Sequence, residues 1–378
     1  MRPMLPGEES CAWISLTRAP ASSPDSLAAA LETFGSARAL LESSDAARRA
    51  AGVPEATCEF LSSAHAPPSA VERAWLEDPC HALIPFTDPR YPKLVRNCAR
   101  HPLALYVAGT AEVMNDPQLA IVGSRNPSAQ GHETAHEFAE DLAARGLGIV
   151  SGLAMGVDTS AHCGALAAQG TTLAVLGSGV DVVYPTGNVS LAAEIRRCGA
   201  LISAFPLGTA PRREHFPQRN WLIAALGLGT LVIEAARRSG SLITARLAAD
   251  LGRRVFAVPG SIRSPLSRGC HQLIRQGATL AESAHDILTE LNFSAFFAQR
   301  SASGGDRGAA PTGQLPMDKE QKILLDALGF DPTDLDLLVV RTGFKPEAVS
   351  SMMLILELEG HVQAAPGGRY SRVVRSRR

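Results

Sequence analysis

The sequence predicts an α/β fold whose main part is a doubly wound parallel sheet, with a small helical domain before it and a small mixed domain after it. The sheet is predicted by short apolar runs that alternate with helical patterns between about residues 117 and 292. These runs are continuous rather than alternating in polarity, which is typical of strands buried on both faces. Glycine-rich turns follow most of the runs, as they do where parallel strands end at a ligand site.

The helices of this central region show apolar residues at helical spacing. One helix ends at Gly146, the next opens after Asp158 as a cap and ends at Gly170, and a third has Ser241 as its N-cap and stops at Gly252. Strand and helix repeated in this way predict parallel strands, and the pattern leaves their order open. The expected strands are residues 119–123, 147–152, 172–177, 200–205, 230–235 and 254–260.

The flanking regions differ from the centre. Residues 12 to about 65 predict short helices rich in Ala and Leu, with Ser23 or Asp25 as a cap and Gly35 at a turn. Residues 301–315 have the composition of a flexible linker. A small winged-helix-like unit is predicted by helical patterns at 319–330, 333–343 and 347–360 and a hairpin pattern that turns at 366–368. We therefore expect domains at 1–78, 79–295 and 317–378, with the linker at 296–316.

The composition, 46% hydrophobic and 19% charged, is ordinary for a soluble globular protein. No purely apolar run reaches about 18 residues and the first residues form no apolar segment, so we expect neither a membrane span nor a secretory signal, and a cytoplasmic location. The seven cysteines include no C-x-x-C pair, which argues against a zinc site and against disulfides. Residues 132–136 spell H-E-x-x-H, but no third ligand stands out. No metal and no cofactor are expected.

The net charge of −1 conceals a strong local bias. Between Phe205 and Arg275 the chain has eleven Arg, no Lys and three acids. Arginine forks bind phosphate bidentately and also stack on bases, so this bias indicates a nucleic-acid or nucleotide partner. The alternative is that the arginines reflect the overall composition and lie on solvated faces. The eleven are Arg212, Arg213, Arg219, Arg237, Arg238, Arg246, Arg253, Arg254, Arg263, Arg268 and Arg275.

The first candidate anion site is Gly123-Ser124-Arg125, which follows a strand and precedes a helix capped near Ser128. We expect Arg125 and the helix N-terminus to share a phosphate, and the alternative is a turn with a surface arginine. The second is Phe216 to Asn220, where Pro217 is expected at the first helical position, with Arg219 and Asn220 in the first turn.

Two further turns also place arginine with serine or glycine at the start of a later helix. One is Arg237-Arg238-Ser239-Gly240-Ser241, and the other contains Arg268, Gly269 and His271. His271 is equally consistent with a structural role. The acids at these turns, Asp158, Asp181 and Glu234, fit capping as well as catalysis. No P-loop motif occurs, and the Gly177-Ser178-Gly179 turn lacks the third glycine of a dinucleotide fingerprint.

Several long motifs occur in the order AIVGSRNPSAQG, GIVSGLAMGVDTSAHCGAL, TLAVLGSGVDVVYP, HFPQRN, VIEAARRSGSLITA and VFAVPGSIRSPLSRGCHQLIRQGA. Together they closely resemble the DNA-processing protein A family over about residues 80–290, and the tail ELEGHVQ…GGRYSR resembles its winged-helix-like domain. The resemblance implies an extended Rossmann-like domain that binds single-stranded DNA, forms a homodimer and hands the strand to the recombinase RecA. It also implies that the DNA is shielded from nucleases during natural transformation.

By position, the family's DNA-binding arginine falls on Arg125 and its F-P-x-R-N segment on Phe216 to Asn220. The chain departs from the family where Trp221 and Thr186 replace frequent basic residues, and Trp221 is either a stacking platform or part of the core. The N-terminal region lacks the glycine hairpin of a helix-hairpin-helix DNA binder.

We therefore expect a non-enzymatic, sequence-independent binder of single-stranded DNA. Its phosphate contacts would come from Arg125, Arg219, Arg237 and Arg268, with Asn220 at a base or sugar. The full expected site is Gly123, Ser124, Arg125, Arg219, Asn220, Arg237, Arg238, Ser239, Gly240, Ser241, Arg268, Gly269 and His271.

Two other hypotheses remain at this point. One is a nucleotide hydrolase with Asp158 or Glu234 as the acid, and the other is a recombination scaffold with incidental DNA affinity. The last C-terminal helix, from Glu347 to Glu359, carries acids and no base. It suits a protein partner better than a DNA groove, and plain core packing is an equal alternative.

Overall fold

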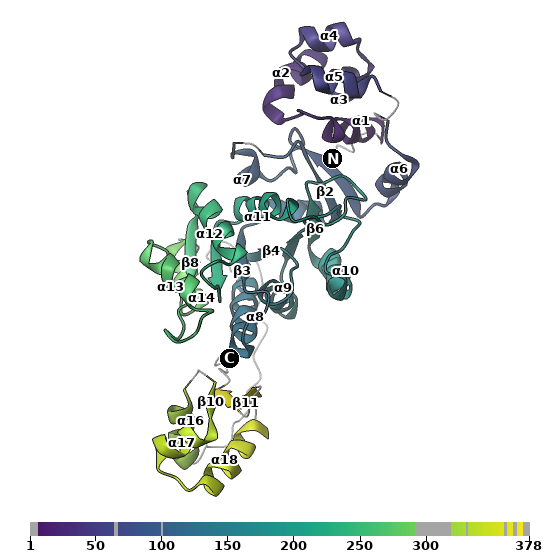
Figure 1. The fold of residues 1–378 in the computed structure, drawn as a ribbon. Coiled ribbons are helices and arrows are strands. Elements are labelled where there is room, and N and C mark those ends of the chain that lie inside the picture. Colours follow the sequence, from purple (N-terminus) through teal and green to yellow (C-terminus); the bar gives the residue numbers. More distant parts are fainter. Residues whose placement is uncertain are drawn as a thin grey trace, which may run out of the picture.

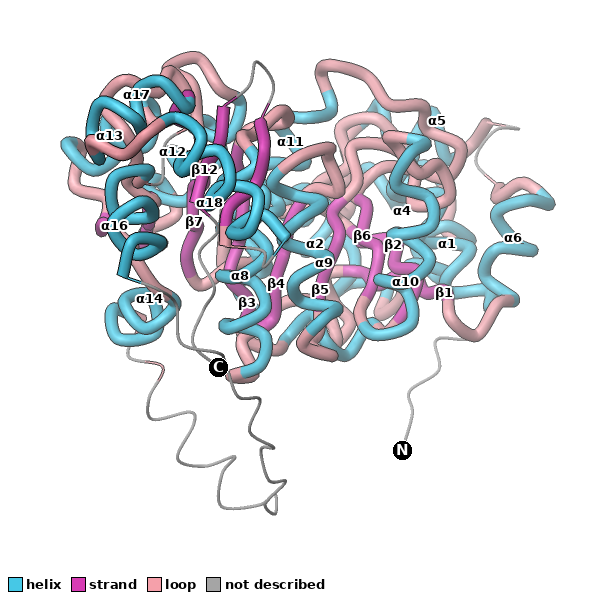
Figure 2. Tube along the Cα trace, turned by 90° about the horizontal axis from the view of Figure 1, so that it is seen from below, coloured by secondary structure: helices cyan, strands magenta, loops and turns pink. Residues whose placement is uncertain are grey.

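The computed structural model describes residues 7–63, 67–99, 101–291, 293, 319–329, 332–358, 361–365 and 369–372. Its centre is a nine-stranded sheet with the order β1-β2-β6-β5-β4-β3-β7-β8-β9. Strands β3 to β9 are parallel to their neighbours within this set, whereas β1 and β2 are antiparallel additions beside β6. Figure 2 shows the strands from β7 to β1 side by side in this order.

The prediction of a doubly wound parallel sheet is confirmed, and each of the six expected strands has a counterpart among β3 to β8. The bounds are β1 (His81–Pro85), β2 (Ala104–Gly109), β3 (Gln118–Gly123), β4 (Gly148–Ser151), β5 (Thr172–Val175), β6 (Ala200–Ser203), β7 (Gly229–Ile233), β8 (Arg254–Ala257) and β9 (Thr279–Leu280).

Helices cover both faces of the sheet, because neighbouring residues of a strand point to opposite faces. Ile121 lies in one core with α8, α9 and α14, and its neighbour Val122 lies in another with α11, α12 and α13. Figure 1 shows these helices around the sheet. The bounds are α7 (Lys93–Arg96), α8 (Ala129–Ala144), α9 (Val157–Ala167), α10 (Val189–Cys198), α11 (His215–Leu226), α12 (Gly240–Asp250), α13 (Arg268–Arg275) and α14 (Ala284–Glu290), with short 3₁₀ turns η1 (Ala111–Asn115) and η2 (Thr186–Asn188).

The N-terminal helices share a hydrophobic core with the antiparallel side of the sheet. Trp13 and Leu16 pack in the same cluster as Tyr106 and Leu201, and Thr17 Oγ1 lies 3.0 Å from the Tyr106 hydroxyl. Ser23 caps its helix as expected, and Gly35 ends that helix with a φ of 77°. The helices are α1 (Gly7–Arg18), α2 (Pro24–Phe34), α3 (Ala37–Glu42), α4 (Asp45–Ala50), α5 (Glu55–Leu61) and α6 (Ala70–Glu77).

The C-terminal unit has a core of its own, to which Leu324, Leu338, Met353 and Val362 contribute. Its three helices and antiparallel strand pair confirm the expected winged-helix-like unit. The expected turn at 366–368 and the linker at 301–315 lie outside the described residues. The elements are α16 (Lys319–Leu328), β10 (Thr333–Asp334), α17 (Leu335–Thr342), α18 (Pro346–Leu358), β11 (Val362–Ala365) and β12 (Arg369–Arg372). Among the described helices, none combines the length and the apolar character that a membrane crossing requires.

Candidate nucleic-acid interface

The chain passes from β3 through β4 and β5 to β6 on one side, then returns to β7 on the other side of β3. The carboxyl ends of these parallel strands therefore meet at one edge, where such sheets bind ligands. The turns after the strands touch one another there. The Val157 amide donates to the Ser124 carbonyl over 3.1 Å, and Gly156 lies so close to Ser124 and Arg125 that a Cβ would collide with their backbone.

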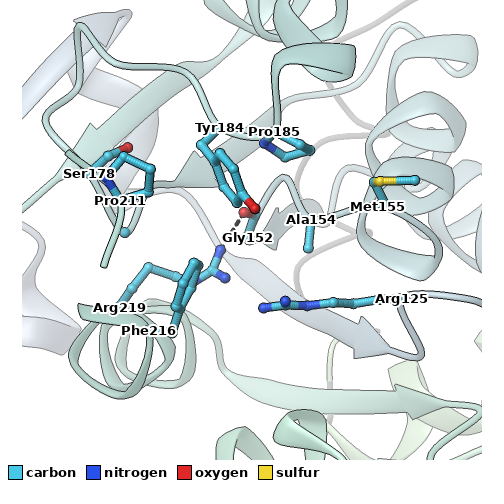
Figure 3. Close-up of a pocket in the computed structure, with 11 residues that line it drawn as sticks. Arg125, Gly152, Ala154, Met155, Ser178, Tyr184, Pro185, Pro211, Phe216 and Arg219 are labelled. Atoms are coloured by element: carbon cyan, nitrogen blue, oxygen red, sulfur yellow. Dashed lines mark hydrogen bonds between the residues drawn. The ribbon is translucent and has the colours of Figure 1, made fainter. Parts of the chain in front are cut away.

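At this edge the turns enclose a cavity of about 110 Å³. Figure 3 shows Arg125 reaching toward Arg219 and Phe216, with Tyr184 and Pro185 opposite them. The lip carries exposed apolar groups, because Met155 is 62% exposed and Tyr184 49%. The lining residues are Arg125, Gly152, Ala154, Met155, Gly177, Ser178, Tyr184, Pro185, Pro211, Phe216 and Arg219.

Two guanidinium groups lie beside one aromatic ring in this cavity. The Cζ atom of Arg125 lies 5.2 Å from the centre of the Phe216 ring, and that of Arg219 lies 5.5 Å from it. The Tyr184 ring lies 6.5 Å from the Phe216 ring, centre to centre. Rings and guanidinium groups together offer a stacking surface for a base and a positive charge for a phosphate.

Arg219 is held from beneath and is only 5% exposed. Its Nη1 donates to the Gly152 carbonyl and, over 3.1 Å, to the Val175 carbonyl. Gly152 must lack a side chain, since a Cβ would fall on the Arg219 guanidinium. Burial lowers the pKa of Arg219 to about 10, with the Asp158 carboxylate opposing this shift and Arg125 adding to it.

The expected position of Arg219 in the first turn of its helix is wrong. Helix α11 begins at His215, so Pro217 is its third residue and Arg219 its fifth. This earlier start, by two residues, places Arg219 in the second turn and over the sheet, where its guanidinium ties the ends of β4 and β5 together. Asn220 follows on the same helix and is partly exposed. Trp221 packs against the core beneath α11, which favours the core interpretation of this residue.

The N-terminus of α8 is not open to a phosphate in the expected way. Ser128 accepts the Gly131 amide over 3.0 Å, and the Glu234 carboxylate accepts the Ser128 amide over 2.7 Å. A side-chain anion of the protein therefore occupies the position expected for the phosphate. Arg125, which precedes the helix, is exposed and points to the cavity instead.

The other predicted residues lie on the turns after β7 and β8. Arg237, Arg238 and Arg268 are exposed. The two turns are joined, because the Ala235 amide donates to the Leu266 carbonyl and the Gly269 amide to the Ala235 carbonyl, over 2.6 and 2.7 Å. Gly269 permits this approach, since a Cβ there would collide with the Ala235 backbone.

The structure corrects two expected helix caps, one on the turn after β7 and one on the turn after β4. Helix α12 begins at Gly240, and its N-cap is Ser239, because Ser239 has the extended backbone of a cap. Ser241, the expected cap, is instead buried in the first turn of the helix. Helix α9 has Gly156 as its N-cap, and Asp158 instead accepts the Gly152 and Ala154 amides over 3.1 and 3.3 Å. His271 Nε2 lies 3.0 Å from the Gly260 carbonyl, which gives it a structural contact.

The exposed arginines of this edge have no acidic partner among the described residues. The ion pairs of the described chain involve arginines elsewhere, such as Arg145 with Asp141 on α8 and Arg254 with Glu290. Arg125, Arg237, Arg238, Arg263 and Arg268 take part in none of them. Unpaired cations gathered at one edge leave a charge that an external anion neutralises.

Several lining residues were absent from the expected site. Met155 and Tyr184 lie in the same glycine-rich turns as residues that were considered, but neither has a charge or a motif of its own. The segment GVDVVYP, with an aromatic residue directly after a strand turn, was the available signal for Tyr184. Gly152 and Phe216 are needed to seat Arg219, which only the folded contact reveals.

The two acids of the hydrolase hypothesis have structural contacts. Asp158 is buried against backbone amides, and Glu234 caps α8. His132 of the H-E-x-x-H segment contacts Ser160 over 2.8 Å, and His136 lies 3.7 Å from Glu140. No group of three or more His, Cys, Asp or Glu side chains suited to a metal occurs in the part of the chain that the structure describes.

Comparison with known proteins agrees with this architecture. The family model of DNA recombination-mediator protein A matches residues 82–292, and that of the DprA winged helix domain matches residues 308–368. Protein Smf of Escherichia coli is 40% identical over 301 residues, which cover 78% of each chain. The DNA processing protein DprA of Streptococcus pneumoniae is 44% identical over 206 residues, covering 54% of this chain and 73% of the relative.

Two solved structures are also similar. The X-ray structure of DprA from Streptococcus pneumoniae has a TM-score of 0.63 and 33% identity, covering 76% of this chain and 99% of that one. DNA processing protein A from Helicobacter pylori, described for its single-stranded DNA binding mode, has a TM-score of 0.50 and 29% identity, covering 54% and 93%. The fold, the ordered motifs and these matches establish that the chain belongs to the DprA family of DNA processing proteins.

Proposed function

We propose that this protein binds single-stranded DNA without sequence preference along the carboxyl edge of its sheet. The observation that carries the proposal is the convergence of Arg125, Tyr184 and Phe216 on one cavity. An unstacked base enters the cavity and packs on the rings, and Arg125 contacts a neighbouring phosphate. A duplex keeps its bases stacked and therefore offers nothing that fits this cavity.

The charge of the edge extends the contact beyond one nucleotide. Arg237 and Arg238 on the turn after β7, and Arg268 after β8, are exposed and unpaired within the described chain. The phosphate backbone of a DNA strand that crosses this edge contacts these guanidinium groups in succession. Arginine suits this task, because its charge is permanent and its planar fork matches phosphate oxygens.

The relatives support the wider role. The matching family model is that of a recombination-mediator protein, and the Helicobacter pylori relative binds single-stranded DNA. Together with the sequence resemblance, these support a homodimer in the cytoplasm that shields single-stranded DNA and delivers it to RecA during natural transformation. The protein acts by binding, without a catalytic residue.

A salt titration of DNA binding tests the proposal. Fluorescence anisotropy of a labelled oligo(dT) should give an affinity that falls with salt at a slope of about −0.7 per phosphate contacted. Arg125→Ala should weaken binding by about tenfold and reduce the slope by about 0.7. Arg145→Ala is the matched control, since this arginine is exposed but paired with Asp141 over 2.7 Å. Salt-independent binding, or an unchanged Arg125→Ala variant, contradicts the proposal.

A further inference from the structure

Ile262 is the most exposed large apolar side chain among the described residues, at 84%. It lies on the turn between β8 and α13, at the same edge of the sheet as the cavity. A single exposed isoleucine is common on protein surfaces. The local structure and the charge around this one are what distinguish it.

The turn that carries Ile262 is held in place by hydrogen bonds on both sides of the residue. The Ser264 amide donates to the Ser261 carbonyl over 3.0 Å, and the Arg263 amide donates to Ser261 Oγ over 3.2 Å. The same turn is anchored to the neighbouring one through the Ala235 amide and the Leu266 carbonyl. The fold therefore presents the isoleucine to solvent on an ordered support, at little entropic cost to a ligand.

The two joined turns are rich in arginine, and their one acid, Glu234, is bound to Ser128 at the start of α8. Arg263 is adjacent in sequence, Arg268 follows on α13, and Arg237 and Arg238 lie on the neighbouring turn. The nearest acid in the sequence before Ile262, Asp250, ends α12 at the opposite edge of the sheet. An apolar tip among unpaired guanidinium groups matches a ligand that alternates flat apolar faces with anions, which is the chemistry of a nucleic-acid strand.

The sheet sets the separation between this tip and the cavity. The cavity lies over the ends of β3, β4 and β5, and β8 follows four positions after β5 in the strand order. At roughly 4.8 Å per strand, β8 is about 10 Å from the near side of the cavity at β3 and about 19 Å from its far side at β5. Arg237 and Arg238 lie on the β7 turn between them, and Arg125 lines the cavity itself.

We propose that Ile262 is a second base contact, at which a strand that leaves the cavity packs another base after crossing the β7 turn. The inference rests on the proposed function and adds a path along the sheet edge to it. Arg263 and Arg268 hold phosphates on either side of that base. A strand too short to span both places engages the cavity alone.

Binding of short and long oligo(dT) to the full chain tests this path. Anisotropy is measured with one oligonucleotide of about two nucleotides and one of about twenty, for the natural protein, Ile262→Ala and Arg263→Ala. Ile262→Ala should weaken binding of the long strand on the order of fivefold, with an unchanged salt slope and unchanged binding of the short strand. Arg263→Ala should weaken binding of the long oligonucleotide and reduce the salt slope of its affinity. Val71→Ala is the control, since Val71 is 70% exposed on α6.

The outcomes separate the two proposals. If the natural protein binds with the expected salt slope and Ile262→Ala is unchanged on the long strand, the second contact is wrong and the proposed function stands. An equal loss on both lengths also overturns the second contact. If Ile262→Ala alters only the sedimentation coefficient, the tip is a protein contact and the proposal fails. If the natural protein binds neither oligonucleotide, the proposed function fails, and the second contact with it.

Discussion

The Arg125 guanidinium lies over the Phe216 ring, with 5.2 Å between its Cζ atom and the ring centre. Arg219 approaches the same ring from α11, at 5.5 Å. The two cations have different surroundings, because Arg125 is exposed and Arg219 is buried beneath carbonyl groups. We infer that the exposed cation contacts the ligand and that the buried one builds the floor on which the ring rests.

Arg219→Met tests this division of roles. The substitution removes the bonds to the Gly152 and Val175 carbonyls and leaves the buried Asp158 without its nearby cation. We expect the free energy of unfolding to fall by about 3 kcal/mol, measured by urea denaturation, as for a broken buried ion pair. Arg145→Met, which breaks an exposed pair, should cost less than about 1 kcal/mol.

The salt dependence of DNA binding shows whether Arg219 supports the Phe216 ring or contacts the DNA itself. The Arg219→Met variant is assayed without urea, at a temperature at which it remains folded. It should bind oligo(dT) more weakly than the natural protein does, with the same salt slope. A slope reduced by about 0.7 would show that Arg219 itself neutralises a phosphate, and would refute the assignment.

Tyr184 should contribute to binding through its ring alone. Its side chain is 49% exposed and faces Phe216 across the cavity. Tyr184→Ala should weaken oligo(dT) binding by about 1–3 kcal/mol without changing the salt slope, because the stacking surface carries no charge. Tyr184→Phe keeps the ring and should bind as the natural protein does. Equal losses in the two variants would point to the hydroxyl instead of the ring.

The stability of the fold should fall in mild acid because of His162. This residue is fully buried, with Nδ1 2.7 Å from Thr172 Oγ1. Burial lowers its pKa to about 3, with the Arg219 cation adding to the shift. The unfolded chain takes up a proton near pH 6.5, so the stabilisation is fully present above this pH and is lost as the pH falls from there toward 3.

The expected loss from His162 is about 1.4 kcal/mol between pH 7.5 and 5.5, measured as free energy of unfolding in urea. His162→Gln, which has no titrating group, should show a correspondingly smaller loss over the same interval. If the two proteins lose the same amount, His162 does not carry the pH dependence.

Deletion of residues 317–378 should leave most single-strand binding intact. The C-terminal unit has a separate core, so its removal exposes little of the sheet domain. Its α18 follows Lys345 and carries no base between Pro346 and Leu358. The affinity for oligo(dT) should change by less than about threefold, which is below the value of one charged contact. A collapse of affinity would assign the DNA site to the C-terminal unit.

The strands and glycine turns were predictable because buried strands and tight turns have local signatures. The antiparallel pairing of β1 and β2 beside β6 and their core with α1 were not, since such pairing depends on contacts distant in sequence. The position of Arg219 failed for the same reason. Its partners Gly152 and Val175 are 67 and 44 residues away, and only their carbonyls make burial of an arginine acceptable.

The anion at the start of α8 shows a second limit of local reasoning. A glycine turn before a helix predicts a phosphate there, but Glu234 fills that position from 106 residues away. Arg125 lies at the expected edge of the sheet because it directly follows a strand, where chain position alone sets the edge, and its contact with DNA stays a prediction. Tyr184 was missed because an aromatic residue in a turn has no charge to mark it.

The most direct test compares a single-stranded oligonucleotide with a duplex of the same sequence across a salt titration. We expect the single strand to bind more tightly at every salt concentration, with an affinity that falls linearly on a double-logarithmic plot at about −0.7 per phosphate. A duplex bound as tightly as the single strand, or an affinity indifferent to salt, would contradict this expectation.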